Sequence, residues 1–373
     1  MEINKIVLRK MNLELKAPFQ TSFGVQKDRD FMIVELHSNN HIGYGECVAT
    51  AKPLYGEETV GTVELILEEI LIPTLLDNEI QHPDELNELF KPFRRNNMAK
   101  AALEGAYWDL FAKEKNISLH EALGGTKSEI EVGVSIGIQE SLESLLKEVE
   151  GYVNEGYKRI KLKIEPGNDL TLLEGVRRKF PDIEMMADAN SAYTLDDIEL
   201  FKKMDNLNLT MIEQPLAHDD IIDHAKLQSE INSAICLDES IHSLEDAKKA
   251  IELGSCKIIN LKIGRVGGLT EAKKIHDFCE SKGIPVWCGG MLESGIGRAH
   301  NIAITSLPNF TLPGDTAASS RYWNEDIISP EVTVEKGIIT LPNSPGIGFE
   351  PNIALMEKYT TGIKEIVSKK VFS

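Results

Sequence analysis

From about residue 132, the chain alternates short apolar runs with longer stretches whose apolar positions recur at helical spacing. The apolar runs read VGVSIG, RIKLKI, EMMADA, LTMIEQP, ICLDES, KIINLKI, VWCGG and TLPGD. Repetition of an apolar run and an amphipathic stretch predicts parallel strand–helix units. Eight such units favour a closed (β/α) barrel over an open doubly wound sheet, which usually has fewer strands.

The first 125 residues follow a different pattern. Residues 6–15 and 31–36 carry the alternating polar and apolar positions that are typical of half-buried strands. Residues 98–113, with the sequence MAKAALEGAYWDLFAK, place small and apolar side chains on one helical face. We therefore expect an α+β domain in front of the barrel.

The strand–helix rhythm stops after about residue 321. The stretch VTVEKGIITLP predicts a hairpin, and residues 352–358 predict a final helix. Because this tail is too short to fold alone, we expect it to pack on the N-terminal domain. The predicted fold class is thus α/β, with an α+β domain at 1–125, a barrel at 126–320 and a C-terminal segment at 321–373 that completes the first domain.

Composition narrows the class of function. The chain of 373 residues has a formal net charge of −19, which argues against nucleic-acid and anionic-membrane partners because both need a cationic face. The five cysteines are scattered without a CxxC pair, which is typical of reduced thiols. The start of the chain lacks a hydrophobic signal region, and the richest apolar stretch, VELILEEILIPTLL, is interrupted by acids and a proline. We therefore expect a cytoplasmic protein that acts on a small molecule.

Three carboxylates recur at an even spacing. Asp188, Glu213 and Asp238 each end an apolar run, 25 residues apart. Side chains at the same point of successive barrel units converge on the C-terminal mouth. Carboxylates without His or Cys suit Mg²⁺ or Mn²⁺, so the spacing predicts a site for a hard cation. The alternative is that each acid caps the helix after it, but the shared spacing favours the metal site.

Lysines lie on both sides of these acids along the chain. Lys161 and Lys163 alternate on one predicted strand and both point into the barrel, while Lys262 ends a strand on the opposite side. A buried lysine needs a partner or a task. A nearby cation and a second ammonium favour the neutral amine, which is the form that a base needs. We interpret the lysines as acid–base groups for a carbon next to a carboxylate, the alternative being pairs with structural acids.

Asn190 follows Asp188 by two residues and is expected at the same mouth, where it either binds substrate or serves as a turn residue. Glu239 follows Asp238 and either supports the site or takes part in the chemistry.

The ordered motifs resemble those of the enolase superfamily, within its muconate-lactonizing-enzyme subgroup. They are the K-x-K pair, the DAN at Asp188, the EQP at Glu213, the LDES around Asp238 and the strand-end Lys262. The stretches NLKIGRVGGLTEA, VWCGGMLESGIGRAHNIA, LPGDTAASSRYW and NNMAKAALEGAYWD further resemble the o-succinylbenzoate synthase / N-succinylamino acid racemase branch. The resemblance covers nearly the whole chain.

The resemblance implies a modified TIM barrel, (β/α)7β, with a capping domain whose loops close over the mouth. Those loops would be residues 17–24 and 49–57, with Phe19, Phe23 and Tyr55 as an apolar lid.

Further substrate-binding positions are implied in the same way. They are Lys161, Asn190, Ser135, Gly290, Met291 and Arg265, the last matching an arginine of members that also racemize.

The implied reaction is dehydration of 2-succinyl-6-hydroxy-2,4-cyclohexadiene-1-carboxylate to o-succinylbenzoate in menaquinone biosynthesis. The resemblance implies that Asp188, Glu213 and Asp238 hold Mg²⁺, that Lys163 is the base and then the acid, and that Lys262 stays charged. The alternative is racemization of N-succinyl or other N-acyl amino acids by the same two lysines, and the sequence leaves both reactions open. Cycloisomerization, dipeptide epimerization and sugar-acid dehydration are more distant alternatives. We also expect a homo-oligomer.

Overall fold

The computed structural model describes residues 1–21 and 24–368 of the chain. Its centre is a seven-stranded parallel sheet in which neighbouring strands follow chain order, as consecutive strand–helix units require. The strands are β5 (Val134–Ile136), β6 (Ile160–Lys163), β7 (Met185–Asp188), β8 (Ile212–Glu213), β9 (Ile235–Leu237), β10 (Ile258–Leu261) and β11 (Val286–Cys288).

The ring is closed by an irregular segment instead of an eighth strand. In the described part of the chain, this segment forms only isolated bridges, one between Val286 and Phe310, just before the TLPGD run, and one between Val132 and Gly314 within it. The Asp315 amide donates to the Cys288 carbonyl at 2.8 Å, which joins this segment to β11. Proline has no N–H to donate to a ladder, so a regular strand is disfavoured here. The barrel is therefore of the expected (β/α)7β type.

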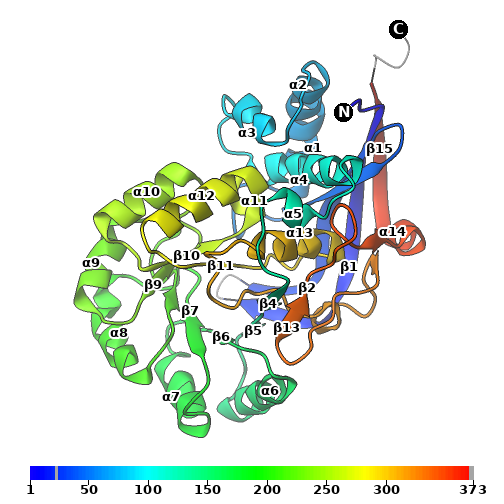
Figure 1. The fold of residues 1–373 in the computed structure, drawn as a ribbon. Helices are drawn as coiled ribbons and strands as arrows, with labels where there is room; N and C mark the ends of the chain where they lie inside the picture. The colour runs from blue at the N-terminus through cyan, green and yellow to red at the C-terminus, as the bar shows by residue number, and fades with distance from the viewer. Residues whose placement is uncertain (22–23, 369–373) are drawn as a thin grey trace.

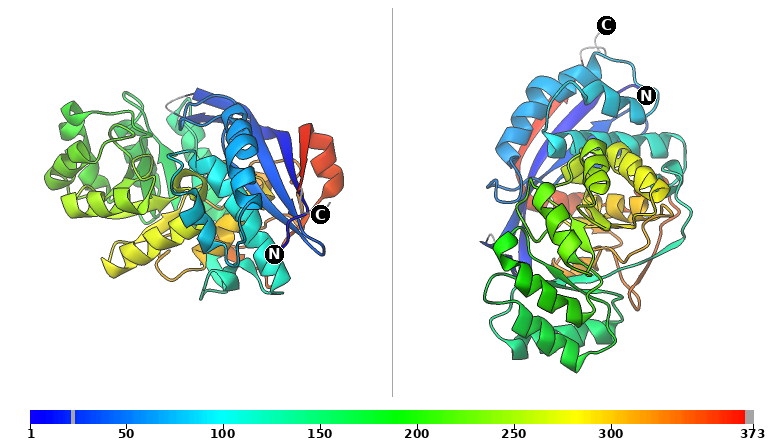
Figure 2. Two further views of the ribbon diagram at one scale, coloured as in Figure 1. Left: turned by 90° about the horizontal axis from the view of Figure 1, so that it is seen from above. Right: turned by 90° about the vertical axis from the view of Figure 1, so that its left-hand side faces the viewer.

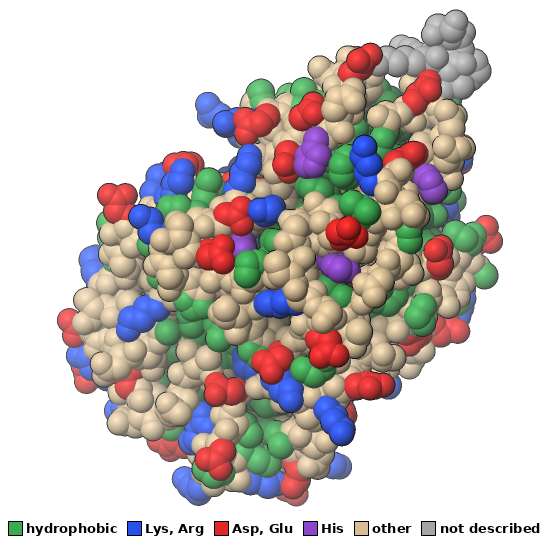
Figure 3. Space-filling model, viewed as in Figure 1, with side chains coloured by type: hydrophobic (Ala, Val, Ile, Leu, Met, Phe, Trp, Pro, Cys, Tyr) green, Lys and Arg blue, Asp and Glu red, His purple; other side chains and the backbone are tan. Residues whose placement is uncertain are grey.

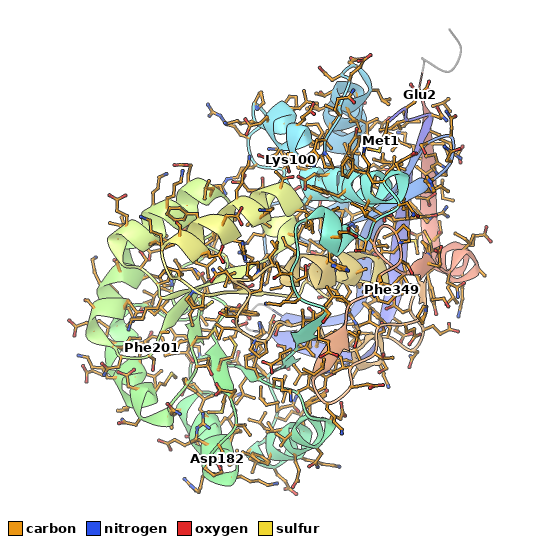
Figure 4. All side chains as sticks on the ribbon, in the orientation of Figure 1. Met1, Glu2, Lys100, Asp182, Phe201 and Phe349 are labelled. Atoms are coloured by element: carbon orange, nitrogen blue, oxygen red, sulfur yellow. The ribbon has the colours of Figure 1, made fainter. Side chains whose placement is uncertain are left out.

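Most helices of the barrel lie on the side away from the capping sheet, and those after the sixth and seventh strands pack against the cap (Figure 1). Phe201 shows how they pack, because this residue of α8 is fully buried and meets Tyr193 edge-on, with ring centroids 5.3 Å apart (Figure 4). The helices are α6 (Leu142–Glu155), α7 (Leu170–Lys179), α8 (Ile198–Met204), α9 (Ile222–Glu230), α10 (Leu244–Leu253), α11 (Ile263–Val266), α12 (Leu269–Ser281) and α13 (Gly295–Thr305).

The capping domain is built on a four-stranded antiparallel sheet in the order β15-β1-β2-β3, and the two views of Figure 2 show β15 beside the N-terminal strands. The predicted helix at 98–113 is α4, which packs across β3. The elements are β1 (Lys5–Thr21), β2 (Gly24–His37), β3 (Ile42–Cys47), α1 (Val60–Ile66), α2 (Ile72–Leu76), α3 (Asp84–Phe90), α4 (Asn97–Glu114), α5 (Leu119–Ala122) and β15 (Thr360–Val367).

Two local expectations were wrong. The stretch 17–21 continues β1 and pairs with β2, with Phe19 opposite Gln26, so it is a hairpin arm and not a free loop. The predicted tail hairpin is present only as an isolated antiparallel bridge between Glu335 and Ile338, and the longer pairing of β13 (Ile338–Thr340) is with β4 (Glu129–Glu131). This pairing buries Ile339 against Ile130, which a local hairpin would leave without a partner.

The C-terminal segment also contributes β12 (Ile328–Ser329), β14 (Glu350–Pro351) and α14 (Ile353–Tyr359), the last confirming the predicted final helix. It ends in β15, which adds to the edge of β1 with Lys5 opposite Val367. The division at residues 125 and 320 and the homo-oligomer stay predictions.

The surface in view carries charges of both signs, and the thiols are buried. Acidic and basic side chains are interspersed over the face seen in Figure 3, without a broad basic patch on that face. All five cysteines are buried and free. Among the helices of the described residues, none is both long and apolar enough to traverse a membrane.

Candidate active site

The predicted acids meet at the C-terminal ends of three neighbouring strands. Asp188 ends β7 and is in register with Glu213, which ends β8. Asp238 follows the last residue of β9. All three side chains are buried, with residues at most 1% exposed. The even spacing in the sequence therefore corresponds to one position at successive strand ends.

Lysine ammonium groups lie directly against two of these acids. The Lys161 Nζ is 3.2 Å from Asp188 Oδ2, 3.1 Å from Glu213 Oε2 and 2.6 Å from Asp315 Oδ2. The Lys163 Nζ lies 2.6 Å from Asp188 Oδ2. Buried charges are stable only when paired, and this network pairs each lysine with at least one carboxylate.

Asp238 forms a second cluster with two residues that follow β10 and one residue of the cap. The Lys262 Nζ lies 2.7 Å from Asp238 Oδ2, and the Arg265 guanidinium contacts Oδ1 of the same carboxylate. Tyr55, from the capping domain, donates its hydroxyl to Asp238 Oδ1 at 2.9 Å and accepts from Lys262 at 3.2 Å. Tyr55 is thus a polar contact of the site as well as a residue packed against the core of the cap, and its place in a lid stays a prediction.

The charges shift the titration of the acids in opposite directions. Burial raises the pKa of Glu213, and the charge of Asp188 raises it further. Burial acts the same way on Asp188, but the adjacent Lys163 and Lys161 hold the pKa of Asp188 below its usual value. Unequal pKa values are the expected result of placing two carboxylates side by side between cations.

Lys161 differs from the expectation of a neutral amine, whereas the shift at Lys262 is toward the charged form that was expected there. Burial disfavours the ammonium form of Lys262, but Tyr55, Glu239 and Glu213 outweigh it and raise the pKa of Lys262. Burial is likewise outweighed at Lys161, where Asp315 and Glu213 raise the pKa. The carboxylates around these amines act more strongly than the neighbouring ammonium groups.

The oxygen-rich mouth fits a hard divalent cation by its donor chemistry. The mouth contains the three acids and two further buried oxygens, Glu239 Oε2 and Asn260 Oδ1. These two further oxygens have no hydrogen-bond partner. The Asn260 amide donates its Nδ2 to Glu213 Oε1 at 2.7 Å, which turns its own oxygen away from that acid. Oxygen ligands of this kind suit Mg²⁺ or Mn²⁺. The assignment of Asp188, Glu213 and Asp238 as ligands stays a prediction.

A different trio has its ligand atoms within 4.8 Å of one another in the described residues, namely His276, Asp277 and Glu280 on α12. The predicted ligands are not gathered in this way, because each faces an ammonium or guanidinium group. The ring of His276 accepts from the Asn309 amide at 2.9 Å and contacts Asp277 at 2.8 Å. Both ring nitrogens are therefore engaged, and the two acids are exposed, so this trio is a weak candidate.

One cavity is lined by four of the nine predicted substrate-binding residues and by both proposed catalytic lysines. Lys163 from β6 and Lys262 after β10 face it from two sides, separated in the sheet by β7, β8 and β9. The predicted residues in its lining are Phe19, Ser135, Lys161, Lys163, Lys262 and Gly290. Ser135 Oγ is buried without a partner, so it is available to a ligand.

Other predicted residues lie elsewhere. Tyr55, Asn190 and Arg265 line an adjacent cavity of about 570 Å³ that also contains Glu239. Met291 packs against the core of the capping domain and is not in the lining of the Lys163–Lys262 cavity. Phe23 lies outside the described residues.

Two buried polar residues of the site, Asp315 and Asn260, were not among the predicted ones. Asp315 contacts Lys161, and Asn260 contacts Glu213, while the expected Glu239 contacts Asn190. A signal existed for both missed residues. Asp315 ends the eighth apolar run, as the predicted acids end theirs, and Asn260 precedes Lys262 by two, which places both on one strand face.

Comparisons with known proteins match both parts of the chain. The model "Mandelate racemase / muconate lactonizing enzyme, N-terminal domain" matches residues 3–124, and the model "Enolase C-terminal domain-like" matches residues 144–355. An o-succinylbenzoate synthase of Geobacillus kaustophilus is 58% identical over 96% of both chains. An N-succinylamino acid racemase of Thermus thermophilus is 47% identical over 96% of this chain and 98% of that protein.

Solved structures agree with this match. A crystal structure of an enolase-superfamily member from Listeria innocua has a TM-score of 0.96 and 46% identity, covering 99% of this chain and 100% of the other. With two family models over most of its length, a barrel and cap of the same arrangement, and relatives close to 60% identical, the chain belongs to the mandelate racemase / muconate lactonizing enzyme family of the enolase superfamily.

Proposed function

We propose that the protein is an o-succinylbenzoate synthase, which dehydrates 2-succinyl-6-hydroxy-2,4-cyclohexadiene-1-carboxylate to o-succinylbenzoate. The observation that carries the proposal is the pair Lys163 and Lys262, which face one cavity beside buried carboxylates. The full-length similarity to proteins named as this synthase supports the choice of substrate.

Enzymes of this family depend on a divalent metal ion. We propose Mg²⁺, with Mn²⁺ as a substitute, held by Asp188, Glu213 and Asp238, because oxygen ligands without His or Cys suit these ions. When bound, the ion supplies positive charge that stabilises negative charge on the substrate carboxylate as the neighbouring C–H bond breaks.

The two lysines carry out the proton transfers and stabilise the intermediate. Lys163, as a free amine, takes the proton from the carbon next to the carboxylate, and the electron pair of that C–H bond moves into the carboxylate to give an enediolate. Lys163 then returns the proton to the departing hydroxyl, which leaves as water while the ring becomes aromatic. The Lys262 ammonium stabilises the anionic intermediate from the other side.

The second candidate is racemization of N-succinylamino acids. It is favoured by the position of Lys163 and Lys262 on two sides of one cavity, since inversion needs a proton donor or acceptor on each face of the α-carbon. The similarity to a protein named N-succinylamino acid racemase supports the substrate class. Because one set of groups serves both reactions, we propose that the protein carries out both.

The direct test is turnover by the purified protein supplied with Mg²⁺. Formation of o-succinylbenzoate is followed by absorbance, and inversion of N-succinylamino acids by chiral chromatography. We expect dehydration, with inversion as a second activity. Turnover of the amino acids alone would favour the racemase, and no turnover of either class would reject the proposed function.

A further inference from the structure

Asn190 lies between the proposed base and a buried carboxylate. The Lys163 Nζ donates to Asn190 Oδ1 at 2.6 Å, and Asn190 Nδ2 donates to Glu239 Oε1 at 3.0 Å. A carboxamide has one accepting end and one donating end, so these two bonds define a single orientation of the group. Its oxygen faces the lysine, and its NH₂ faces the acid.

The backbone holds this side chain in place at the end of β7. Asn190 has φ of 41°, a left-handed conformation that asparagine tolerates better than most residues. The backbone N–H of Asn190 donates to Asp188 Oδ1 at 3.0 Å. The backbone N–H of Ser191 donates to the backbone carbonyl of Gln214 at 2.8 Å. An unusual φ at a strand end, fixed from both sides, is typical of residues with a defined geometric task.

The contacts of Lys163 leave one direction open at its nitrogen. Asp188 Oδ2 and Asn190 Oδ1 each lie 2.6 Å from Nζ, and Cε occupies a third tetrahedral position. The fourth position is then left for the proton or lone pair, and Lys163 lines the cavity shared with Lys262. Proton transfer is sensitive to alignment, because a misplacement of about 1 Å costs about 10²-fold in rate.

Glu239 determines which end of the amide faces the lysine. The residue is 5% exposed, and its Oε1 accepts the Asn190 NH₂. If this acceptor were lost, the amide could turn its NH₂ toward the Lys163 nitrogen and lose the bond that orients the lysine.

The other lysine is held by different groups. Lys262 contacts Asp238 at 2.7 Å and the Tyr55 hydroxyl at 3.2 Å. We propose that Asn190 and Glu239 form a positioning pair for Lys163, so that they set the rate of proton transfer on one face of the substrate's α-carbon. This inference rests on the proposed function, because it assumes that Lys163 and Lys262 serve opposite faces.

The test is deuterium uptake at the α-carbon of N-succinylphenylalanine, measured by NMR in D₂O for each enantiomer separately. Early uptake without inversion reports on the lysine that faces the α-proton of the starting enantiomer. For Asn190→Ala, we expect a loss of about 10–100-fold for one enantiomer and less than about threefold for the other. Glu239→Ala should show the same preference, and Glu239→Gln, which keeps an accepting oxygen, should recover most of the rate.

Tyr55→Phe is the matched control, because it removes a hydroxyl that contacts Lys262. Tyr55→Phe should slow deuterium uptake for the enantiomer whose α-proton faces Lys262. Thermal melts and circular dichroism identify variants that fail to fold. If an alanine variant fails to fold, the exchange rates of Glu239→Gln are compared with those of the parent instead. Equal slowing of both enantiomers by Asn190→Ala, or no slowing, would overturn the inference. If the unmodified protein exchanges neither enantiomer, the two-face proposal itself fails, and the pair has no role in it.

Discussion

At the mouth of the barrel, buried acids and buried cations are interleaved. Asp188 and Glu213 share the Lys161 ammonium, while Asp238 is paired with Lys262 and Arg265. Replacing one member leaves its partner buried and unpaired, which costs more than the pair itself contributes. Variants at these positions therefore need a measurement of folding beside each measurement of activity.

The first prediction concerns the ion. Asp188→Asn, Glu213→Gln and Asp238→Asn should each weaken Mn²⁺ binding at least tenfold in calorimetry, because each loses a charged oxygen ligand. Activity should disappear with a chelator and return with Mg²⁺. Glu280→Gln, which changes an exposed acid of the trio on α12, is the control and should bind Mn²⁺ like the parent. If Glu280→Gln loses the ion and the other three do not, the ion belongs to α12.

The second prediction separates the lysines. Lys163→Ala should be inactive in both reactions, because it removes the base. Lys262→Arg keeps a positive charge but cannot act as a base near neutral pH. It should retain some dehydration, reduced by about 10²–10³ in rate by analogy with the loss of an oxyanion-hole donor, and lose racemization. Normal racemization by Lys262→Arg, in a variant that melts like the parent, would refute the two-base assignment.

Among the elements, β3 and α4 approach each other unusually closely. A Cβ on Gly45 would lie 2.0 Å from the Ala102 carbonyl oxygen, and one on Gly43 would lie 2.1 Å from the Ala106 carbonyl oxygen. Backbone atoms cannot move aside as a flexible side chain can. The small residues in GYGE and in the AALEGA stretch of α4 therefore permit the sheet and the helix to pack backbone to backbone.

The third prediction follows from this contact. Gly45→Ala should lower the free energy of unfolding by about 1–3 kcal/mol or more, as overpacking of a tight core does. Gly151→Ala is the control, because Gly151 lies in α6 with no atom within 4 Å of the added Cβ. That substitution should stabilise by about 0.5–1 kcal/mol, since alanine has the higher helix propensity. The measurement is urea unfolding of both variants and the parent. Equal free energies of unfolding for Gly45→Ala and the parent would contradict the packing argument.

For the whole molecule, buried carboxylates of the cap bind helices of the barrel. Glu46 of β3 accepts from the amides of Ser294 and Gly297, at 3.1 and 2.9 Å, at the start of α13. Glu104 of α4 accepts from the Thr270 amide at 3.2 Å, at the start of α12. Both acids therefore fix helix N-termini across the cap–barrel interface, where unpaired amides need acceptors.

The fourth prediction uses the titration of this interface. Burial raises the pKa of Glu104 to about 7, well above the ordinary value near 4.5. Between these values the folded state binds more protons than the unfolded state, so the free energy of unfolding falls as pH rises through this window. Glu104→Gln removes the titrating carboxyl group. The free energy of unfolding of this variant, relative to that of the parent, should therefore rise by about 3 kcal/mol at most between pH 4.5 and pH 7.

Urea unfolding at pH 5 and pH 8 measures this effect. Glu252→Gln is the control, because it makes the same substitution at an exposed glutamate of α10. A pH-independent difference between Glu104→Gln and the parent would contradict the prediction.

The barrel and its acid positions were predictable because they depend on local periodicity. A parallel strand–helix unit of fixed length brings equivalent residues to the same end of the sheet, so Asp188, Glu213 and Asp238 could be placed from spacing alone. The tail was harder. The strand-like stretch before Leu341 predicts a local hairpin, yet β13 pairs with β4 about 200 residues earlier. No local pattern distinguishes two such partners, because the alternation of polar and apolar residues along a strand is the same whichever strand pairs with it.

The sequence by itself thus determined the order of strands, the family motifs and the arrival of three acids and three lysines at one mouth. Only the tertiary structure decided which of these groups touch. It brought Tyr55 of the cap to Lys262, Asp315 to Lys161, and Glu239 to Asn190, and it placed Met291 against the cap. It also raised the pKa of Lys161, where a neutral amine was expected. The physical reason is that contacts and charge states depend on distances between residues far apart in the chain, which the packing of cap on barrel sets and periodicity does not.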